Sequence, residues 1–183
     1  MRRVILRDLT PFFWLVLAMT LSSCGYTATR ILPSYYRTIY VEPFQNGIPI
    51  TRETDERGFI TSFPELEEKV TQGVIGRFIS DGNLRITNQL EMADLVLMGK
   101  LLDFYRQPIR RKDDDTVEEY RLNLSASVVL RDKEGKLLLQ ESALAGDTTY
   151  FLSGPSAKSE GAAVDDLVTD FSRRIVEWVI EYW

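Results

Sequence analysis

The segment Tyr120-Arg121-Leu122-Asn123-Leu124-Ser125-Ala126-Ser127-Val128-Val129-Leu130-Arg131 has the clearest periodicity in this chain. Aromatic, aliphatic or small apolar residues stand at every even position, and all the odd positions except Val129 are polar. Alternation of this kind predicts a β-strand with one buried face and one largely solvated face. The segment therefore indicates a sheet that is covered on one side.

Further strands flank this segment in the sequence. On its C-terminal side, Gly135 supplies a turn residue within 132–136, and residues 137–144 continue as a strand. On its N-terminal side, residues 93–106 contain a longer apolar strand. These three strands predict an antiparallel meander. The other expected strands are 38–44 and 84–88.

Two amphipathic helices are predicted from apolar residues at helical spacing. The first follows a capping box, in which Ser62 caps the helix and Glu65 returns the hydrogen bond, and it ends near Gly82. Gly73 and Gly76 inside this helix indicate a close approach of the helix to the sheet. The apolar stripes are Leu66, Val70, Val74 and Phe78 in the first helix, and Val164, Leu167, Val168, Phe171, Ile175, Trp178 and Tyr182 in the second.

Together these elements predict an α+β fold with the order β-α-β-β-β-β-α. Two helices pack on one face of a mostly antiparallel sheet of four to five strands, because both helices and the sheet must bury an apolar side. The connections 45–61 and 146–161 contain glycine, proline and polar residues, and we expect both to be loops.

The N-terminus has the pattern of a lipoprotein export signal. Three arginines in the first seven residues precede an apolar stretch over 11–19, which is shorter than the roughly 20 residues of a transmembrane helix. The run Leu21-Ser22-Ser23-Cys24 then brings small residues before the only cysteine of the chain. We expect cleavage between Ser23 and Cys24, with a diacylglyceryl group and an N-acyl chain on Cys24. The alternative, a buried structural cysteine, leaves these neighbours unexplained.

This signal divides the chain into a cleaved peptide over 1–23, a lipidated linker over 24–37 and a single α+β domain over 38–183. Two or more acyl chains would tether the domain stably to a membrane, whereas one chain holds only marginally. Residues 24–183 contain 19 Lys and Arg against 26 Asp and Glu. This acidic balance argues against nucleic acid as a partner.

The sequence offers no catalytic centre and no cofactor site. Histidine is absent, which removes the usual general base near neutral pH and the commonest metal ligand. Neither a Gly-x-Ser-x-Gly motif nor a glycine-rich phosphate loop is present. Asp113, Asp114 and Asp115 are consecutive, whereas calcium loops place their oxygen ligands at alternate positions. We therefore expect no enzymatic activity and no metal ion.

Arg106, Arg110, Arg111 and Lys112 form a basic cluster between two of the predicted strands. Forked hydrogen bonds from such side chains suit phosphate and carboxylate groups, so the basic cluster is a candidate binding site. The three aspartates that follow favour an alternative: a solvated hairpin tip whose basic and acidic halves neutralise each other.

Several short motifs follow one another along the mature chain. They are Cys24-Gly25-Tyr26, Ile39-Tyr40-Val41-Glu42-Pro43-Phe44-Gln45-Asn46, Ala93-Asp94-Leu95-Val96-Leu97-Met98-Gly99, Tyr120-Arg121-Leu122 and Val128-Val129-Leu130-Arg131-Asp132. In order and spacing they resemble the LptE family, the lipopolysaccharide-assembly lipoproteins, over essentially all of the mature chain.

The resemblance implies a two-helix, mostly four-stranded sandwich that plugs the barrel of the outer-membrane translocon protein LptD. Such a protein would assist assembly of the barrel and delivery of lipopolysaccharide to the cell surface, without catalysing a reaction. It would be anchored by lipid at the periplasmic face of the outer membrane, and Gly25 directly after Cys24 agrees with that sorting. The family also binds lipopolysaccharide through basic side chains, for which the basic cluster supplies candidates from local charge alone.

Two other classes of protein remain open. An auxiliary lipoprotein of an ABC-type lipid transport system also combines a lipid tether with a first strand of the Val-x-Pro-Phe type, here Val41-Glu42-Pro43-Phe44. It would co-purify with an inner-membrane transporter, and an LptE-like protein would co-purify with an outer-membrane barrel. A lipid-tethered hydrolase would need a catalytic centre built without histidine.

Overall fold

The alternating segment lies in β5 (Val117–Asp132), which pairs with β4 (Leu95–Arg111) on one side and β6 (Leu137–Phe151) on the other. Both pairings are antiparallel, so the predicted meander is confirmed. We describe residues 33, 35–49 and 63–182 from a computed structural model. The buried positions of β5 with this alternation are Leu122, Leu124, Ala126, Val128 and Leu130.

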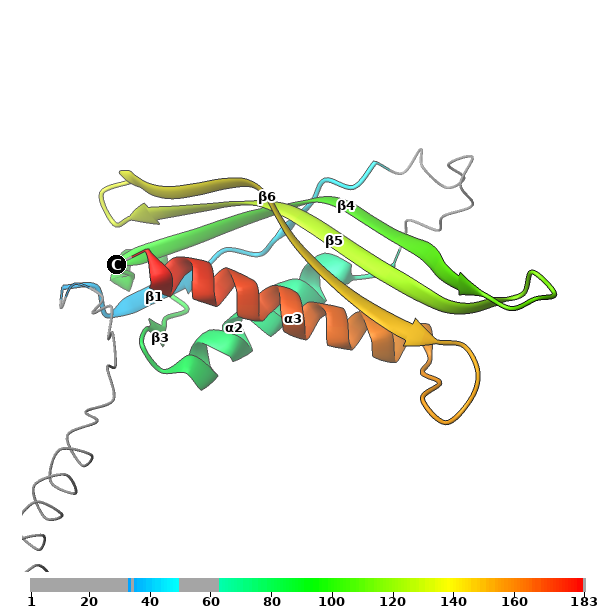
Figure 1. Cartoon of the computed structure of the whole chain (residues 1–183). Helices are drawn as coiled ribbons and strands as arrows, with labels where there is room; N and C mark the ends of the chain where they lie inside the picture. Colours follow the sequence, from blue (N-terminus) through cyan, green and yellow to red (C-terminus); the bar gives the residue numbers. More distant parts are fainter. Residues whose placement is uncertain (1–32, 34, 50–62, 183) are drawn as a thin grey trace, which may run out of the picture. The chain divides into compact units, whose positions relative to one another are not determined.

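Two helices, α2 (Leu66–Asp81) and α3 (Glu160–Glu181), cover the face of the sheet to which these side chains point (Figure 1). The helices run parallel to each other, since the ion pair Lys69–Asp165 lies one turn before the contact of Gly73 with Val168. The buried stripes of both helices meet the sheet in one continuous core. The predicted packing of both helices on one face is therefore confirmed, and we call the other side of the sheet the open face.

The sheet is mixed, and the prediction of a mostly antiparallel sheet was wrong. Two short strands, β1 (Thr38–Val41) and β3 (Arg85–Ile86), add in parallel in the order β3-β1-β4-β5-β6. Between β1 and β3 the chain passes through α2, which packs on one face of the sheet. A helical crossover connection of this kind joins parallel strands. Side-chain periodicity predicts a strand but does not give its direction.

Three predicted boundaries also differ from the structure. Within the expected loop 45–61, residues Gln45–Asn46 form β2, which pairs in parallel with β4 and is the sixth strand of the sheet in the described residues. At the other end of the sheet, β4 extends through Arg111 and β6 through Phe151, into segments that were expected to be connections. Long neighbouring strands stabilise each other by pairing, which local composition does not reveal.

A bulge in β4 keeps its apolar side chains on the core side. The register against β5 shifts between Leu101 and Asp103, so one extra residue is accommodated there. Leu97 and Leu101 point to the core before the shift, and Phe104 points to it afterwards. A β-bulge re-aims the following side chains in this way.

Two local predictions for the first helix were wrong. Glu65 is the residue directly before α2, with a left-handed backbone (φ 58°), and its side chain makes no capping hydrogen bond. It therefore cannot act as the fourth residue of a capping box, and Ser62 lies outside the described residues. Gly73 approaches α3 rather than the sheet: a Cβ there would lie 2.6 Å from Val168 and 2.7 Å from Ser172 Oγ.

The predictions for the signal peptide, for cleavage at Ser23 and for lipidation of Cys24 lie outside the described residues. Among the helices of the described part, none is long and apolar enough to cross a membrane. A short 3₁₀ helix, η2 (Leu90–Met92), connects β3 to β4.

The domain has two distinct ends along its strands (Figure 1). The β1 end comprises the start of β1, η2, the β5–β6 turn (133–136) and the C-termini of α2 and α3. The hairpin end comprises the β4–β5 turn (112–116), the end of β6 and the start of α3.

Candidate functional site

The basic cluster lies at the hairpin end, but its residues do not share one surface. In the β4–β5 register, Arg106 is opposite Leu122, whereas Arg110 is opposite Glu119 after a second bulge that follows Pro108. Leu122 belongs to the core-facing set, and Glu119 has the opposite parity. Arg106 therefore lies on the helix-covered face, and Arg110 lies on the open face.

Arg106 is held inside the hairpin end by several side chains. Its guanidinium Nη1 donates to Glu160 Oε2 at 2.9 Å, and its Cζ lies 4.5 Å above the centroid of the Tyr120 ring. Tyr120 in turn stacks on the buried Tyr150, with 5.9 Å between ring centroids. The Arg106 side chain is only 17% exposed. Its cation already has a carboxylate partner and an aromatic face, two interactions that arginine favours.

The pKa values of Arg106 and Tyr150 are both raised above their ordinary values. Burial alone would lower the pKa of Arg106, but the Tyr150 hydroxyl and the Glu160 carboxylate raise that pKa above its ordinary value. Burial raises the pKa of the Tyr150 phenol, although Arg106 acts in the opposite direction. Arg106 is therefore a permanent cation, and Tyr150 stays neutral at physiological pH.

The outer part of the basic cluster is more accessible. Arg110 Nε lies 3.4 Å from Glu119 Oε2, and Arg110 also lies over the Phe151 ring. Arg111 Nη1 donates to the Asp115 carbonyl at 3.0 Å and lies 3.4 Å from its carboxylate. Both guanidinium side chains are about half exposed, at 59% and 49%. The Arg111–Asp115 pair is exposed on both sides and contributes about 0–1 kcal/mol, so an incoming anion can displace it. The Glu119 side chain is only 11% exposed, so Arg110 keeps this partner.

The acidic half of the hairpin turn is organised by hydrogen bonds within the turn. Asp114 Oδ1 accepts the Thr116 amide at 3.0 Å, and hydrogen bonds from the Thr116 hydroxyl and amide lower the pKa of Asp114. Lys112 lies in the same turn, where its amide donates to the Thr116 carbonyl. In the described part of the chain, no group of three His, Cys, Asp or Glu side chains could hold a metal ion.

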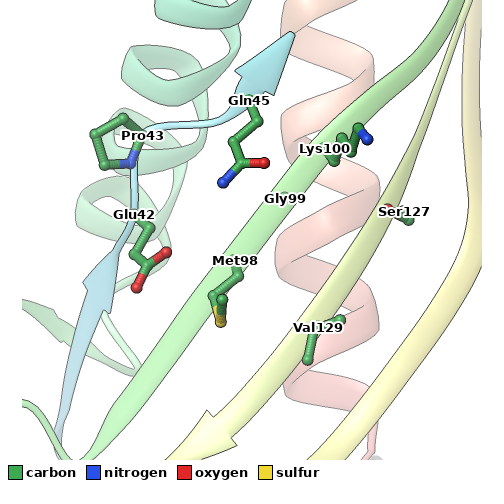
Figure 2. A pocket seen from close by; sticks show the side chains of 8 residues that line it. All are labelled: Glu42, Pro43, Gln45, Met98, Gly99, Lys100, Ser127 and Val129. Carbon is green, nitrogen blue, oxygen red and sulfur yellow. The ribbon is translucent and has the colours of Figure 1, made fainter. Parts of the chain in front are cut away.

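The open face carries a shallow pocket of about 160 Å³ near the middle of the sheet (Figure 2). It forms where the chain leaves β1 at Glu42 and Pro43 before rejoining the sheet as β2. Figure 2 shows Met98 of β4 beside Val129 of β5, and Lys100 of β4 nearer to Ser127 of β5. The lining combines apolar, amide and charged side chains. Its lining residues are Glu42, Pro43, Gln45, Met98, Gly99, Lys100, Ser127 and Val129.

Two larger surface hollows, of about 340 and 380 Å³, lie along α2. Glu68 and Gln72 line both of them, and Lys69 and Asp165 form an ion pair in the first. Charged and amide side chains line both hollows together with Val168 of α3 in the first and with Pro43 and Phe44 in the second. They are therefore surface hollows of mixed chemistry along α2.

The Pro43-Phe44 motif joins three elements of the fold. The buried Phe44 ring lies on Gly99 of β4, where any side chain would overlap the ring. The Phe44 amide donates to Thr71 Oγ1 of α2 at 2.9 Å, and the same hydroxyl donates to the Glu67 carbonyl. Glycine at position 99 is therefore required by the close approach of an aromatic ring.

The Ala93-Asp94 motif fixes the start of β1. Asp94 Oδ2 accepts hydrogen bonds from the Arg37 amide at 2.8 Å, from the Thr38 amide at 3.0 Å and from the Thr38 hydroxyl at 2.9 Å. Partial burial would raise the pKa of Asp94, but these donors outweigh burial and lower it. In the sequence, the Pro43-Phe44 and Ala93-Asp94 motifs indicated only a resemblance to a family. Their structural roles could not be predicted, because the contacts join residues that are far apart in sequence.

Comparison with known proteins gives one family and one fold. The family model LptE, described as lipopolysaccharide-assembly, matches residues 36–177. That range begins just before β1 and ends within the last two turns of α3. No curated protein matches the chain.

Two solved structures share the fold at low sequence identity. Lipoprotein B from Nitrosomonas europaea, solved by NMR, has a TM-score of 0.53 at 13% identity, over 87% of this chain and 90% of that one. Protein CT253 from Chlamydia trachomatis has a TM-score of 0.50 at 14% identity, over 80% of this chain and 97% of that one. At these identities the likeness concerns the fold alone.

Proposed function

Because this chain belongs to the LptE family of lipopolysaccharide-assembly proteins, we propose that it is the lipoprotein partner of an LptD-type outer-membrane barrel. In this role it plugs the barrel, assists its assembly and helps deliver lipopolysaccharide to the cell surface. The observation that carries the proposal is the family match over 36–177, which spans all the described strands, α2 and most of α3.

A non-catalytic role follows from the family and agrees with the chemistry of the surface. The LptE family assembles lipopolysaccharide without catalysis. The chain has no histidine, and the pocket on the open face combines apolar, amide and charged side chains without a nucleophile and base in contact. The protein works by binding, and its folded domain supplies surfaces for a barrel and for a lipid.

The membrane anchor of this proposal is the lipid on Cys24. The cysteine follows Leu21-Ser22-Ser23, and two or more acyl chains would hold the protein stably at the periplasmic face of the outer membrane. Intact-mass measurement of the purified full-length protein tests the anchor. A diacylglyceryl group and an N-acyl chain should add their mass to a chain that begins at Cys24, and an unmodified mature chain would contradict the proposal.

For the lipopolysaccharide contact, we propose the outer part of the basic cluster. Arg110, Arg111 and Lys112 are exposed at the hairpin end, whereas Arg106 is already held by Glu160 and Tyr120. A phosphate can accept a forked hydrogen bond from Arg111 in place of the Asp115 carboxylate at 3.4 Å, and it can also accept from the exposed part of the Arg110 guanidinium beside Glu119. The double variant Arg110→Glu with Arg111→Glu should weaken lipopolysaccharide binding about tenfold or more, by reversing two charges.

The matched control for this double variant is Arg173→Glu with Arg174→Glu on α3. Those arginines also pair with carboxylates at the surface, but they lie in the second half of α3, away from its start at the hairpin end. Both double variants should still co-purify with the barrel. If the two double variants bound lipopolysaccharide equally well, the basic cluster would instead be a solvated hairpin tip whose basic and acidic halves neutralise each other.

The assembly role is tested by depleting the protein in cells. We expect surface lipopolysaccharide and the level of the folded barrel to fall together. Normal values for both would refute the role. Co-purification separates the rival class of protein, since recovery of an inner-membrane ABC transporter in place of a barrel would support an auxiliary transport lipoprotein.

A further inference from the structure

Exposed large apolar side chains are concentrated at the β1 end of the domain. Tyr35 is 66% exposed and Met92 is 65% exposed, and four others of this kind lie in the same region. In the described residues, only Ile109 and Leu152 are comparably exposed at the hairpin end. The six at the β1 end are Tyr35, Ile79, Leu90, Met92, Leu137 and Tyr182.

Backbone contacts hold the segments that carry these side chains together. The Thr38 hydroxyl oxygen lies 3.1 Å from the Met92 carbonyl oxygen, which places the start of β1 beside η2. The Lys133 amide donates to the Asp94 carbonyl at 3.0 Å, which joins the β5–β6 turn to the start of β4. Figure 1 shows the C-terminus of α3 at the same end. The exposed side chains therefore belong to one end of a rigid unit.

We propose that the β1 end is a membrane-contacting surface that lies in the interfacial zone of a lipid bilayer. The inference rests on the proposed function to the extent that Cys24 carries the anchor. It adds to that function a second, non-covalent contact between the folded domain and the membrane. The occupant of this surface is the lipid bilayer itself.

The length of the chain before the domain identifies the occupant. Eight residues separate Cys24 from Pro33, so the anchor lies at most about 30 Å from Pro33. The hairpin end is farther away by the length of β5, whose 16 residues span about 50 Å. The β1 end is thus the part of the domain that the tether holds next to the membrane, and a tether makes even a weak contact effective through high local concentration.

The chemistry of the surface suits the bilayer interface. Tyrosine combines an apolar ring with a polar hydroxyl and is enriched at membrane–water interfaces, and leucine and methionine can enter the acyl boundary. The charges nearby have both signs, since Lys133 and Lys136 alternate with Asp132 and Glu134 along the β5–β6 turn. The contact should therefore form on zwitterionic lipid and depend little on salt.

Site-specific quenching tests the proposal on the full-length, lipidated protein. Acylation of Cys24 leaves no other thiol in the chain, so Met92→Cys and Ile109→Cys can each be labelled with one environment-sensitive fluorophore. The labelled proteins are reconstituted in phosphatidylcholine vesicles that contain a nitroxide lipid. We expect at least about twofold stronger quenching at position 92 than at the matched control position 109, because interfacial contacts place side chains at the headgroup level.

The outcomes of this experiment are distinct. Equal quenching at both positions, in protein whose intact mass shows the acyl groups, would overturn the membrane contact while the anchor stands. A missing acyl mass would overturn the anchor and, with it, this inference. Unchanged quenching in 0.5 M salt is expected, and loss of the position-92 signal in salt would overturn the apolar nature of the contact.

A second set of variants separates lipid from protein as the occupant. Tyr35→Ser, Met92→Ser and Leu137→Ser are combined and compared with Ile109→Ser and Leu152→Ser, using a fluorophore at Leu90→Cys in both backgrounds. The triple variant should lose about half or more of the quenching at position 90, as its apolar contacts are removed, and should still recover the barrel. Loss of the barrel with unchanged quenching would assign the surface to the barrel and overturn the proposal.

Discussion

The two ends of the domain are held together by different means. At the β1 end, the Asp94 carboxylate binds the backbone at Arg37 and Thr38, and the β5–β6 turn is joined through the backbone of Asp94. At the hairpin end, backbone hydrogen bonds such as that from the Lys158 amide to the Phe151 carbonyl are joined by a side-chain link, because Arg106 connects Tyr120 on β5 to Glu160 on α3.

This difference determines what each end can offer a partner. Backbone hydrogen bonds at the β1 end leave its aromatic and apolar side chains exposed. At the hairpin end, Arg106 is used to hold the structure, and only the outer arginines keep half of their surface in solvent. The charge of the basic cluster therefore overstates the charge that is available for binding.

The largest effect is expected from Asp94→Ala, which removes the acceptor that holds the β1 end. Hydrogen bonds to a charged group contribute about 1.5–3 kcal/mol each when buried, and this carboxylate is only partly buried, so we expect a loss of about 3 kcal/mol in the free energy of unfolding. Urea denaturation followed by circular dichroism measures it. Glu91→Ala, an exposed carboxylate three residues earlier, is the control and should change stability by less than about 0.5 kcal/mol. Equal losses would contradict the role of Asp94.

Acid provides a second measurement of the same carboxylate. The pKa of Asp94 is below its ordinary value of 3.8 in the folded protein, so its stabilising contribution is complete above that value and is lost as the pH falls through the lower folded-state pKa. Asp94→Asn should therefore lose less stability than the wild type between pH 5 and pH 2. An unchanged pH dependence would show that other carboxylates, such as Asp170 with its lowered pKa, dominate.

The next effect is expected at the hairpin end, from Arg106→Ala. This change removes an ion pair and a cation–π contact around a side chain that is largely buried, and it should cost about 2 kcal/mol of unfolding free energy. Arg106→Lys keeps the charge but loses the planar stacking on Tyr120, so it should cost about half as much. Near-ultraviolet circular dichroism of the tyrosines gives an independent signal. If Arg106→Ala left the free energy of unfolding unchanged, apolar packing alone would hold this end.

A smaller effect, of opposite sign at two neighbouring positions, tests the helix pair that runs between the ends. Gly73→Ala would meet Val168 and Ser172 at 2.6–2.7 Å and should cost about 1–2 kcal/mol through overpacking. Gly76→Ala meets no atom within 4 Å and should stabilise α2 by about 0.5–1 kcal/mol. Thermal denaturation of the two variants should shift in opposite directions, and shifts of the same sign would contradict the helix contact.

The smallest effect is expected from Arg111→Ala. Its pair with Asp115 is exposed on both sides, so the change in unfolding free energy should be within about 0.5 kcal/mol. Arg106 and Arg111 are both arginines of β4, so the changes in unfolding free energy of the two alanine variants can be compared directly. If Arg111→Ala were as destabilising as Arg106→Ala, the distinction between a structural and an available arginine would fail.

The sequence predicted those parts of the fold in which periodicity is local. Alternation over 120–131 correctly gave the buried face of β5, because every second side chain of a strand points to the same side. The helices followed from apolar residues at steps of three and four. In contrast, β2 has only two residues, too few for any period, and its existence depends on pairing with Lys100 and Leu101 of β4.

The candidate site was harder to predict for a related reason. Arg106 and Arg110 are close in sequence, but the bulge after Pro108 and the pleat of the strand send them to opposite faces of the sheet. The partners that distinguish them, Glu160 and Glu119, come from other elements. Proximity in sequence indicated a cluster, and only the register of the paired strands showed which arginines remain available.

The parallel pairing of β1 also affects the order in which the chain can fold. Asp94 lies 56 positions after Thr38, whereas β4 and β5 are joined by a short turn. Chains emerge from the ribosome N-terminus first, and contacts between distant positions form more slowly than local ones. Among the described strands, the first to be synthesised is therefore among the last to find its place. Until its partners in β3 and β4, within residues 85–97, have arrived, it is an unpaired apolar segment to which a chaperone can bind.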